Sequence, residues 1–563
     1  YETRRITKNE MSEKDYVILL HQNTQYLDDV VISASKFREK RENVAYQIQS
    51  VDIKQIKNTN ASTTADLLTV TQGVTIQKSQ LGGGSPIIRG FEANRVLLVV
   101  DGVRMNNAIY RSGHVQNSIT VDPNALEIVE VVFGPSSTIY GSDALGGIIS
   151  FRSLEANDLL EPGEDFAIEI PASYTSFNRG KSGALKIASR DDKSGISAIG
   201  VISYQDSKER KPKDFADRDN WINDVERTGS SYYFNLVKEA GENKNIALSI
   251  ERVKKDTEST KPVNTLSSYT FMPLAYTKQS QDVEVTKDRV IISYNYANEE
   301  KDSGINTLIA KGYYQNAETD DVWDDERSYF YTPQRRISDY QLKDESYGAD
   351  IQLGSIISGH KLTYGTTFSS TSNEYLQERF ITNKRTNVTT TDHKKRYPDS
   401  DTSRFGIYVQ DELQIGKVDV IAGLRYEKTK VEVESDALHT EYCTGGGSYT
   451  CNLGELDVGA FTPKIGGIMD LSPNVSVYGQ YAMGFKTPTW SEMNAIQTNL
   501  VGSSPYQVRP NPNLDPEKSH SYEVGLRSKT ERNKFRIATF YNKYEDFIGT
   551  SSPTIETVDG VAN

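Results

Sequence analysis

Long hydrophobic runs are absent from this sequence. Its 563 residues have a mean hydropathy of -0.57. No stretch reaches about 18 consecutive apolar residues, the length that a transmembrane helix requires. The pattern therefore indicates no membrane-spanning helix. It leaves a transmembrane β-barrel open, because only every second residue of a barrel strand faces lipid.

An excess of positive charge is also absent. The formal net charge is -13 and the isoelectric point is about 5.2, so no basic face is implied and nucleic acid is not predicted as a partner. The sequence likewise lacks a serine-nucleophile motif, zinc-ligand spacing and a nucleotide-binding loop. We therefore predict a protein that is not an enzyme and that carries no intrinsic cofactor and no resident metal.

Cysteine is scarce. The two cysteines, Cys443 and Cys451, stand on either side of TGGGSYT. This spacing suits a disulfide that closes a loop in an oxidising compartment, and two free thiols are the alternative. A signal peptide is absent at Tyr1, so we expect a mature, trimmed or incompletely represented chain.

Tyrosine is abundant, with 33 residues against 18 phenylalanines and 3 tryptophans. Tyrosine suits strands, interfacial girdles and wet binding surfaces. The chain is too long for one ordinary core, so several domains or one very large barrel are expected. Residues from about 36 to 155 hold short apolar runs broken by glycines, which predicts a compact α/β unit with buried strands.

From about residue 165 onward, strand-length runs of roughly ten residues recur to the end of the chain, the length that a tilted membrane-crossing strand needs. In 417–434, Val418, Val420, Ala422 and Leu424 share one face, although the alternation is imperfect. About 15 strands fit this region. The chain ends in the loop-like DGVAN, so we expect further strands beyond it, because an open barrel edge does not survive in lipid.

The predicted connections alternate in length. Short ones fall at 414–416, 470–474 and 531–534, and long polar ones at 206–230, 254–285, 316–342, 375–402, 433–457 and 486–519. Outer-membrane barrels have short periplasmic turns and long extracellular loops. A soluble β-sandwich does not usually carry six loops this long, and no blade-length repeat indicates a propeller. The acidic stretch 318–326 is predicted to be a solvated face.

Several motifs near the front occur in one order. They are LLTVTQGVTIQ (67–77), IIRGFEANRVLLVVDGVRMNN (87–107) and ALEIVEVVFGPSSTIYGSDALGGIISF (125–151). Together they closely resemble the plug domain of TonB-dependent outer-membrane receptors. The resemblance implies a mainly β fold in the Gram-negative outer membrane, a 22-stranded antiparallel barrel filled by an N-terminal α/β plug. The C-terminal strands are then expected to be absent from this chain.

The resemblance assigns a structural motif to the plug, and glycine there would permit tight turns and close backbone approach. Its members are Arg89, Gly90, Asp101, Gly102, Gly134, Pro135, Tyr140, Gly141, Gly146 and Gly147. The implied domains are the end of a carboxypeptidase-regulatory-like β-domain (1–26), a TonB-box-like segment (27–36), the plug (37–155) and an incomplete barrel (156–563).

The segment LDDVVISASK (27–36) resembles the TonB box, through which a periplasmic energy-transducing TonB-type protein engages such receptors. A β-branched segment of this kind can add as a strand to a partner's sheet edge. An ordinary short strand is the alternative. The residues implied in partner binding are Asp28, Asp29, Val30, Val31, Ile32, Ser33 and Ala34.

Within the family, residues 101–122 are most like the plugs of haem and haemoglobin receptors of the Bacteroidetes type. This implies haem as cargo, with a surface lipoprotein or haemophore as a further partner. Imidazole and tyrosinate are both reasonable haem ligands. The candidates are His114, Tyr110 and Arg111 in the plug, and His393 and His439 in long connections; a solvated surface histidine is the alternative for each.

One departure weakens the haem assignment. Receptors of that group carry a histidine between an aromatic-Arg-Ala-Pro motif and Asn-Pro-Asn-Leu. Here Phe485-Lys486-Thr487-Pro488 precedes Asn511-Pro512-Asn513-Leu514 with no histidine between them. A siderophore, cobalamin or glycan receptor of the same architecture remains an alternative, as does a barrel scaffold in an envelope complex.

Overall fold

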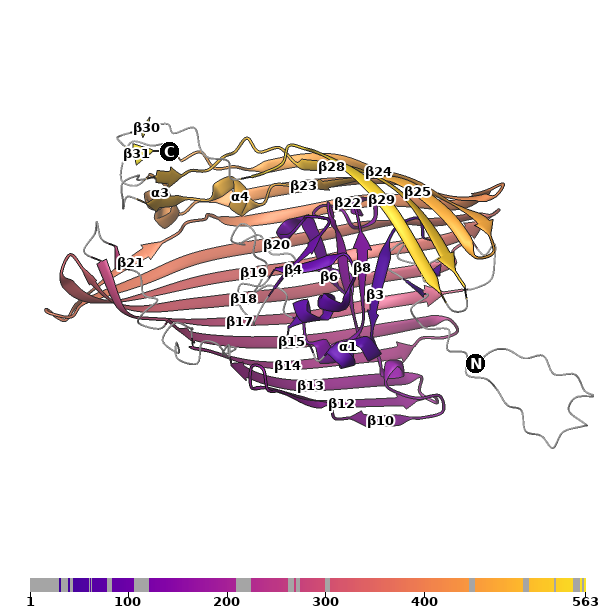
Figure 1. The fold of residues 1–563 in the computed structure, drawn as a ribbon, viewed down its shortest axis with the longest axis horizontal. Helices are drawn as coiled ribbons and strands as arrows, with labels where there is room; N and C mark the ends of the chain where they lie inside the picture. The colour runs from indigo at the N-terminus through magenta and orange to yellow at the C-terminus, as the bar shows by residue number, and fades with distance from the viewer. Residues whose placement is uncertain are drawn as a thin grey trace, which may run out of the picture.

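A computed structural model gives the fold (Figure 1). It describes residues 30–31, 39–40, 44–59, 61, 63–77, 84–105, 121–208, 224–261, 268–269, 274–298, 304–444, 451–499, 506–530, 533–549, 557–558 and 561–562. A large curved antiparallel sheet encloses a smaller unit built from the first third of the chain.

The inner unit is the predicted plug. Its main sheet has the order β3-β8-β9-β6-β7, in which β6 and β9 run parallel and the other pairs are antiparallel. The strands are β3 (Ile48–Asp52), β6 (Val96–Val100), β7 (Val103–Arg104), β8 (Leu126–Phe133) and β9 (Gly147–Ser153), with a separate hairpin of β4 (Val74–Gln77) and β5 (Ser85–Ile88).

Helices in the described residues are short. They are α1 (Ile53–Thr59), α2 (Ser137–Tyr140), α3 (Ala437–Thr444) and α4 (Trp490–Asn494), with 3-10 helices η3 (Thr64–Val70), η4 (Ala93–Arg95), η5 (Pro123–Ala125) and η6 (Ala156–Asp158). No helix in this part of the chain is both long and apolar enough to cross a membrane.

The apolar core of the plug lies within the plug itself. All five residues of β6 are buried, as expected for a central strand covered on both faces. Side chains of β6, β8 and β9 form two apolar clusters, one centred on Val129 and Phe151 and the other on Leu97 and Ile148. The prediction of a compact unit with buried strands is thereby confirmed, and the strands fall at 96–100, 126–133 and 147–153.

The outer sheet contains eighteen strands in the described residues. They are β10 (Phe166–Glu169), β11 (Ala172–Thr175), β12 (Gly180–Asp191), β13 (Ile196–Lys208), β14 (Asp224–Glu239), β15 (Lys244–Thr260), β16 (Ser268–Tyr269), β17 (Leu274–Ala297), β18 (Thr307–Tyr329), β19 (Thr332–Ile357), β20 (His360–Asn383), β21 (Val388–Lys394), β22 (Asp399–Ile415), β23 (Val418–Glu434), β24 (Leu456–Ser472), β25 (Val475–Lys486), β28 (Glu517–Lys529) and β29 (Lys534–Glu545).

In the described residues these strands fill fifteen successive positions in the wall. Strands β10 and β11 pair in turn with β12 and fill one position, while β16 and β21 only extend hairpins beside β17 and β20. This agrees with the predicted number of strands. The remaining strands are β1 (Val30–Val31) with β2 (Glu39–Lys40), and a small sheet of β26 (Gln497–Asn499), β27 (Tyr506–Val508), β30 (Thr557–Val558) and β31 (Val561–Ala562).

Alternation along β23 shows how the wall separates its two faces. Leu424, on the predicted apolar face, is 44% exposed on the outside of the sheet. Arg425 and Glu427 are buried and point toward the plug. A barrel of this kind places apolar residues outward and polar residues in its lumen, which is why mean hydropathy gives so weak a signal.

The connections confirm one prediction and correct another. Short turns join β22 to β23, β24 to β25 and β28 to β29 at the three predicted places. The predicted long loops 254–285, 316–342 and 375–402 are largely wrong, because β15 and β17 to β22 occupy most of them. Strand pairing continues beyond the apolar band, where both faces are polar and no hydrophobic alternation marks the strand. Segments 433–457 and 486–519 retain long connections, which carry α3 and α4.

Candidate functional site: the plug–wall contacts and the long-connection end

A buried ion pair joins the plug to the late strands of the wall. The Arg89 guanidinium donates to a carboxylate oxygen of Glu523 on β28, and the two side chains are 4% and 0% exposed. The Tyr478 hydroxyl donates to the other oxygen of Glu523 at 2.8 Å, and Arg89 stacks over the Phe540 ring at 4.2 Å. Because both groups are buried, loss of either one would leave the charge of the other uncompensated.

A second arginine of the plug makes a bidentate contact six residues earlier on β28. Arg95 donates from Nε and Nη2 to the two oxygens of Glu517 at 2.8 and 2.6 Å. Lys486 lies 3.9 Å from the same carboxylate and bonds Glu492 at 2.8 Å. The planar guanidinium matches a carboxylate geometrically, so this contact fixes orientation as well as charge.

The glycine-rich segment of the plug packs against a charged side chain of β23. A Cβ atom on Gly141 would lie 2.0 Å from Glu427 Oε2, and the residue has φ of +83°. The next amide, that of Ser142, donates to Glu427 Oε1 at 3.0 Å, and Arg425 donates to Oε2 at 2.6 and 2.9 Å. Glycine is therefore required here both for the turn and for the close approach.

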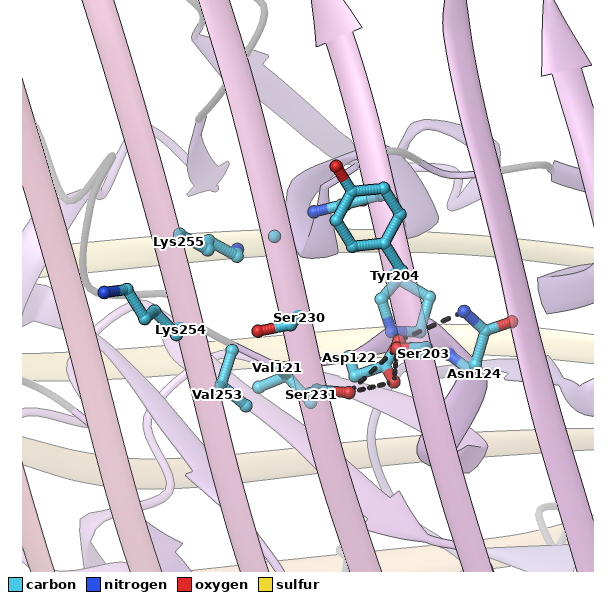
Figure 2. Close-up of a pocket in the computed structure, with 13 residues that line it drawn as sticks. Val121, Asp122, Asn124, Ser203, Tyr204, Ser230, Ser231, Val253, Lys254 and Lys255 are labelled. Atoms are coloured by element: carbon cyan, nitrogen blue, oxygen red, sulfur yellow. Dashed lines mark hydrogen bonds between the residues drawn. The ribbon is translucent and has the colours of Figure 1, made fainter.

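The other side of the plug meets the early strands through a carboxylate. Figure 2 shows Asp122, just before η5, directed at two wall serines. Asp122 Oδ2 accepts from Ser203 Oγ of β13 at 2.5 Å and also from Ser231 Oγ of β14. Asp122 Oδ1 accepts from the Asn124 amide at 2.9 Å. A crevice of about 350 Å³, counting space open to solvent, lies at this seam and reaches Lys255 on β15.

A cationic pair on β17 completes the early contact. Lys287 and Arg289 both bind Glu251 of β15, at 3.2 and 2.9 Å, and all three residues are almost fully buried. Arg289 also donates to the Val100 carbonyl of the plug at 3.2 Å and lies 3.6 Å from Asp101. The wall therefore presents positive charge to plug oxygens on this side.

Aromatic side chains gather where the long connections meet. The Tyr375 and Tyr397 rings lie edge to face with centroids 5.2 Å apart, and Tyr397 makes the same contact with Trp490 at 5.2 Å. The Arg396 guanidinium lies 5.9 Å from the centroid of Tyr340. Trp490 is fully buried. Together, these residues form an aromatic surface with a cation on it.

The segment from Phe485 to Ile496 connects this surface with the plug. The Asp143 amide donates to the Phe485 carbonyl at 3.0 Å, and the Thr487 amide donates to Ser142 Oγ at 3.1 Å. Three residues later Trp490 packs against Tyr397, and the Ile496 amide donates to the Arg396 carbonyl at 3.2 Å. This one segment therefore contacts both the plug turn and the aromatic surface.

Comparison with known proteins identifies the architecture. The family model described as TonB-dependent Receptor Plug Domain matches residues 40–148, and the one described as TonB dependent receptor-like, beta-barrel, matches residues 207–561. The chain belongs to the TonB-dependent receptor family. It is accordingly an outer-membrane β-barrel protein with an N-terminal plug, whose short turns are periplasmic and whose long connections are extracellular.

Individual relatives extend the match along most of the chain. A haemin receptor of Yersinia enterocolitica is 24% identical over 551 residues, which covers 93% of this chain and 70% of the relative. The solved haemophore receptor HasR of Serratia marcescens has a TM-score of 0.65 at 19% identity, covering 90% of this chain and 74% of the receptor. The ferric yersiniabactin receptor FyuA of Yersinia pestis has a TM-score of 0.61 at 14% identity, with 89% and 73% covered.

Residues of the predicted plug motif lie at plug–wall contacts described above or at contacts within the plug. Asp101 accepts from the Ser153 amide and hydroxyl at 2.9 and 2.7 Å. A Cβ on Gly134 would lie 2.9 Å from Arg89 Nη1, and one on Gly146 would lie 2.5 Å from Phe91. Pro135, Tyr140, Gly90, Gly102 and Gly147 fall in the same turns and strand ends.

The predicted histidines are not brought together by the described residues. His114, with Tyr110 and Arg111, lies outside them. His393 is on the outer face of the β20–β21 hairpin, where its Nδ1 lies 3.2 Å from Glu378. His439 is fully buried in α3, so the alternative that it is a solvated surface histidine is wrong. The Ser435 hydroxyl lies 2.9 Å from His439 Nδ1, and burial lowers the pKa of His439.

Two other predictions concern linkages. Cys443 and Cys451 form the predicted disulfide, with Cα atoms 5.8 Å apart. In the TonB-box-like segment, Val30 and Val31 form β1, which pairs with β2 at Glu39 and Lys40. Asp28, Asp29, Ile32, Ser33 and Ala34 lie outside the described residues, as does 1–26.

Sequence reasoning missed the wall partners of the plug arginines. Glu517 and Glu523 follow closely after Asn511-Pro512-Asn513-Leu514, whose family resemblance was visible, so a signal for them existed. Arg396 and Tyr397 lay in a segment predicted to be a loop, and nothing local distinguished them from solvated side chains.

Proposed function

We propose that this receptor binds haem at the cell surface and imports it into the periplasm. The observation that carries the proposal is the alignment with the haemin receptor of Yersinia enterocolitica, which extends over 93% of this chain and 70% of that receptor. A haemin receptor of Yersinia pestis gives a parallel match, 23% identical over 552 residues. Haem or haem from haemoproteins is therefore the cargo class, carried as substrate.

The chemistry of the extracellular mouth supports a flat anionic cargo. Tyr340 and Tyr397 are half-buried, Tyr397 packs on the buried rings of Tyr375 and Trp490, and Arg396 offers a cation beside them. Aromatic rings stack on planar ligands, and guanidinium groups bind carboxylates. Haem has both features, a planar ring and two propionate carboxylates.

Import requires the plug to move, and a TonB-type protein supplies the pull. The Val30–Val31 strand, which pairs with Glu39 and Lys40 of β2 in the described residues, suits exchange for a partner's strand edge. Segment 27–36 is the box in this proposal. A surface lipoprotein or haemophore is the further partner, in keeping with the solved HasR complex with its haemophore HasA.

His114 is the plug ligand in this proposal. It stands in a sequence most like the plugs of haem receptors, and imidazole is a common haem ligand. His393 does not share this role, because it lies on the outer face of its hairpin. The two histidines therefore make a matched pair of test and control.

A ferric siderophore is the second candidate cargo. The absence of a histidine between Phe485 and Leu514 favours it, and the receptor FyuA shares the fold. Phenolate-type siderophores are aromatic and anionic, so the same mouth would accept them. Spectroscopy distinguishes the two, because haem reports on its own iron ligation.

The test is a Soret titration of the purified receptor with haemin, repeated with His114→Ala and His393→Ala. We expect a saturable, red-shifted Soret band that weakens in His114→Ala and is unchanged in His393→Ala. No spectral change with the unaltered receptor would overturn the haem assignment. Deletion of 27–36 should abolish uptake but spare binding; unaltered uptake would instead favour a scaffold role.

A further inference from the structure

Four neighbouring strands of the wall extend well beyond the others. Strands β17, β18, β19 and β20 have 23 to 26 residues each, against 12 residues for β12, β25 and β29. Their pairing continues along this extension, with one register shift in β17 between Tyr276 and Lys278. The extracellular part therefore has two faces, one continuous with the lumen and one continuous with the lipid-facing surface.

The outer face of this extension is acidic. Register rows such as Glu284–Asp320–Gln341 and Thr286–Glu318–Lys343 share the side that carries Tyr314 and Tyr347 in the apolar band. Carboxylates outnumber cations on it; they are Asp282, Glu284, Asp288, Glu318, Asp320, Asp339, Glu345, Glu374 and Glu378. An anionic cargo would be repelled from this side.

The inner face carries aromatic rings and arginines together with carboxylates. Here Trp323 pairs with Ser338 and Ser338 with Arg379, on the side that leads down to Lys287. Two of the inner arginines are neutralised by carboxylates. Arg336 donates from Nε to Asp325 at 3.0 Å, and Arg379 bonds Asp392 on β21.

Arg396 differs from these arginines. It forms no ion pair with a carboxylate of the described residues, its Nε is buried without a hydrogen-bond partner, and its charge faces tyrosine rings. Tyr340, Tyr375, Tyr397 and Tyr442 are its electrostatic neighbours. A half-buried guanidinium in such surroundings favours an anion that neutralises it.

Two further polar groups near Arg396 lack partners in the described residues. Gln377, directly opposite Tyr340 in the β19–β20 register, is 2% exposed, and its Oε1 has no donor. Trp490, in edge contact with Tyr397, is 0% exposed, and its Nε1 has no acceptor. Buried polar groups are normally hydrogen-bonded, so both groups are available to a ligand that reaches Arg396.

We propose that Arg396, walled by Tyr340, Tyr375 and Tyr397, is the site at which the receptor binds a carboxylate of a flat aromatic cargo. The inference rests on the proposed function, because the haem propionates are the carboxylates concerned. The guanidinium takes the carboxylate through two parallel hydrogen bonds, and the tyrosine rings exclude water beside it. The site recognises the acidic edge of the cargo independently of its iron.

Binding there is transmitted toward the plug by the segment already described. The Arg396 carbonyl accepts from Ile496, and the same segment reaches the plug at Thr487 and Ser142. A cargo that displaces Arg396 or Trp490 therefore acts on the strand end that holds the plug turn.

The experiment compares haemin with haemin dimethyl ester, in which both carboxylates are masked while ring and iron are unchanged. Each is titrated against the unaltered receptor, Arg396→Ala, Arg396→Lys and Arg335→Ala. Arg335 is the matched control, because it lies on the outer face of the same wall and pairs with Asp324 at 2.9 Å. Retention of the folded barrel is checked by its resistance to unfolding in detergent on heating.

We expect Arg396→Ala to weaken haemin binding about tenfold or more, the value of one charged hydrogen-bonded contact. The ester should bind the unaltered receptor as weakly as haemin binds Arg396→Ala, and should be insensitive to the substitution. Arg396→Lys should recover part of the loss, and Arg335→Ala should lose nothing.

If Arg396→Ala weakened the binding of haemin and of the ester equally, or weakened neither, the carboxylate role would be overturned. In both cases, haemin binding by the unaltered receptor would leave the proposed function standing. Absence of haemin binding by the unaltered receptor would overturn both. The two failures are therefore distinguishable within one set of titrations.

Discussion

The two sides of the plug are held in different ways. Against the late strands, plug arginines are paired with buried carboxylates of β28, and Arg527 of the same strand donates to the carbonyls of Val44 and Tyr46. Against the early strands, Asp122 accepts from serine hydroxyls, and Leu154 packs in an apolar cluster with wall residues. The late side is a clamp of buried ion pairs, whereas the early side combines one longer arginine–carboxylate contact, Arg289 with Asp101 at 3.6 Å, with hydroxyl hydrogen bonds and apolar packing.

This difference bears on how a filled barrel opens. Apolar burial inside the plug holds the plug together, whereas its contacts with the wall include many polar ones beside two apolar clusters. A polar contact can be exchanged for water in a hydrated lumen at a modest net cost, so long as both partners are rehydrated together. On the early side the arginine–carboxylate contact between wall and plug is longer, 3.6 Å from Arg289 to Asp101, and its carboxylate is 20% exposed, so this is the side at which the plug should loosen first.

The largest effect is expected from Glu523→Ala. The substitution leaves the Arg89 guanidinium buried without its carboxylate and removes the acceptor of the Tyr478 hydroxyl. Removing one partner of a buried pair typically costs about 3–5 kcal/mol. Amide hydrogen exchange, followed by mass spectrometry, should show the plug losing protection while the wall strands keep theirs.

Glu345→Ala provides the matched control for that substitution. Glu345 lies on the exposed outer face and is 3.3 Å from Lys343. An exposed pair contributes only about 0–1 kcal/mol. Equal loss of plug protection in the two variants would mean that the late side is not a clamp.

A smaller effect is expected from Gly141→Ala. The new Cβ would lie 2.0 Å from Glu427 Oε2 at a φ of +83°, so both overpacking and backbone strain act, together about 2–3 kcal/mol. Gly163→Ala isolates the backbone part, because Gly163 has φ of +89° and nothing within 4 Å. Plug protection in Gly141→Ala no lower than in Gly163→Ala would remove the case for close packing against β23.

Asp122→Ala tests the early side and should cost less, about 1–2 kcal/mol. It removes the acceptor of Ser203 and Ser231 and of the Asn124 amide at the start of η5, contacts that are individually worth about 1 kcal/mol. Hydrogen exchange of 121–125 should rise while the late contacts stay protected. A loss as large as that of Glu523→Ala would abolish the distinction between the two sides.

Much of this architecture follows from sequence alone. Buried strands in the plug appear as continuous apolar runs, since both their faces are covered, and β6 is the clearest case. Short turns such as Gln414–Gly416 can be predicted from the residues of the turn itself. The wall was harder to predict, because the outward face of β18 is apolar at Tyr314 but acidic from Glu318 onward.

The candidate site was largely beyond sequence reasoning. Arg396 and Trp490 are separated by 94 positions along the chain, and only the fold places Tyr397 between them. The histidines, which carry the most recognisable chemistry, were predicted by residue type. Residue type does not reveal that His393 faces outward, because that depends on the parity of its register with Glu378.

The smallest effect concerns Asp158, at the junction of plug and wall on the early side. Burial, with Glu127 nearby, raises its pKa to about 7. Because the folded state holds the proton that the unfolded chain releases near pH 4, folding of this junction weakens as pH rises and levels off above pH 7. Because the Asp158 side chain is exposed to solvent, screening keeps the loss between pH 6 and pH 8 below about 1 kcal/mol. Hydrogen exchange of 154–160, corrected for intrinsic rates, should show this loss, and Asp158→Asn should abolish it. An unchanged pH dependence in the variant would locate the titrating group elsewhere and leave the early side without a proton-linked contact.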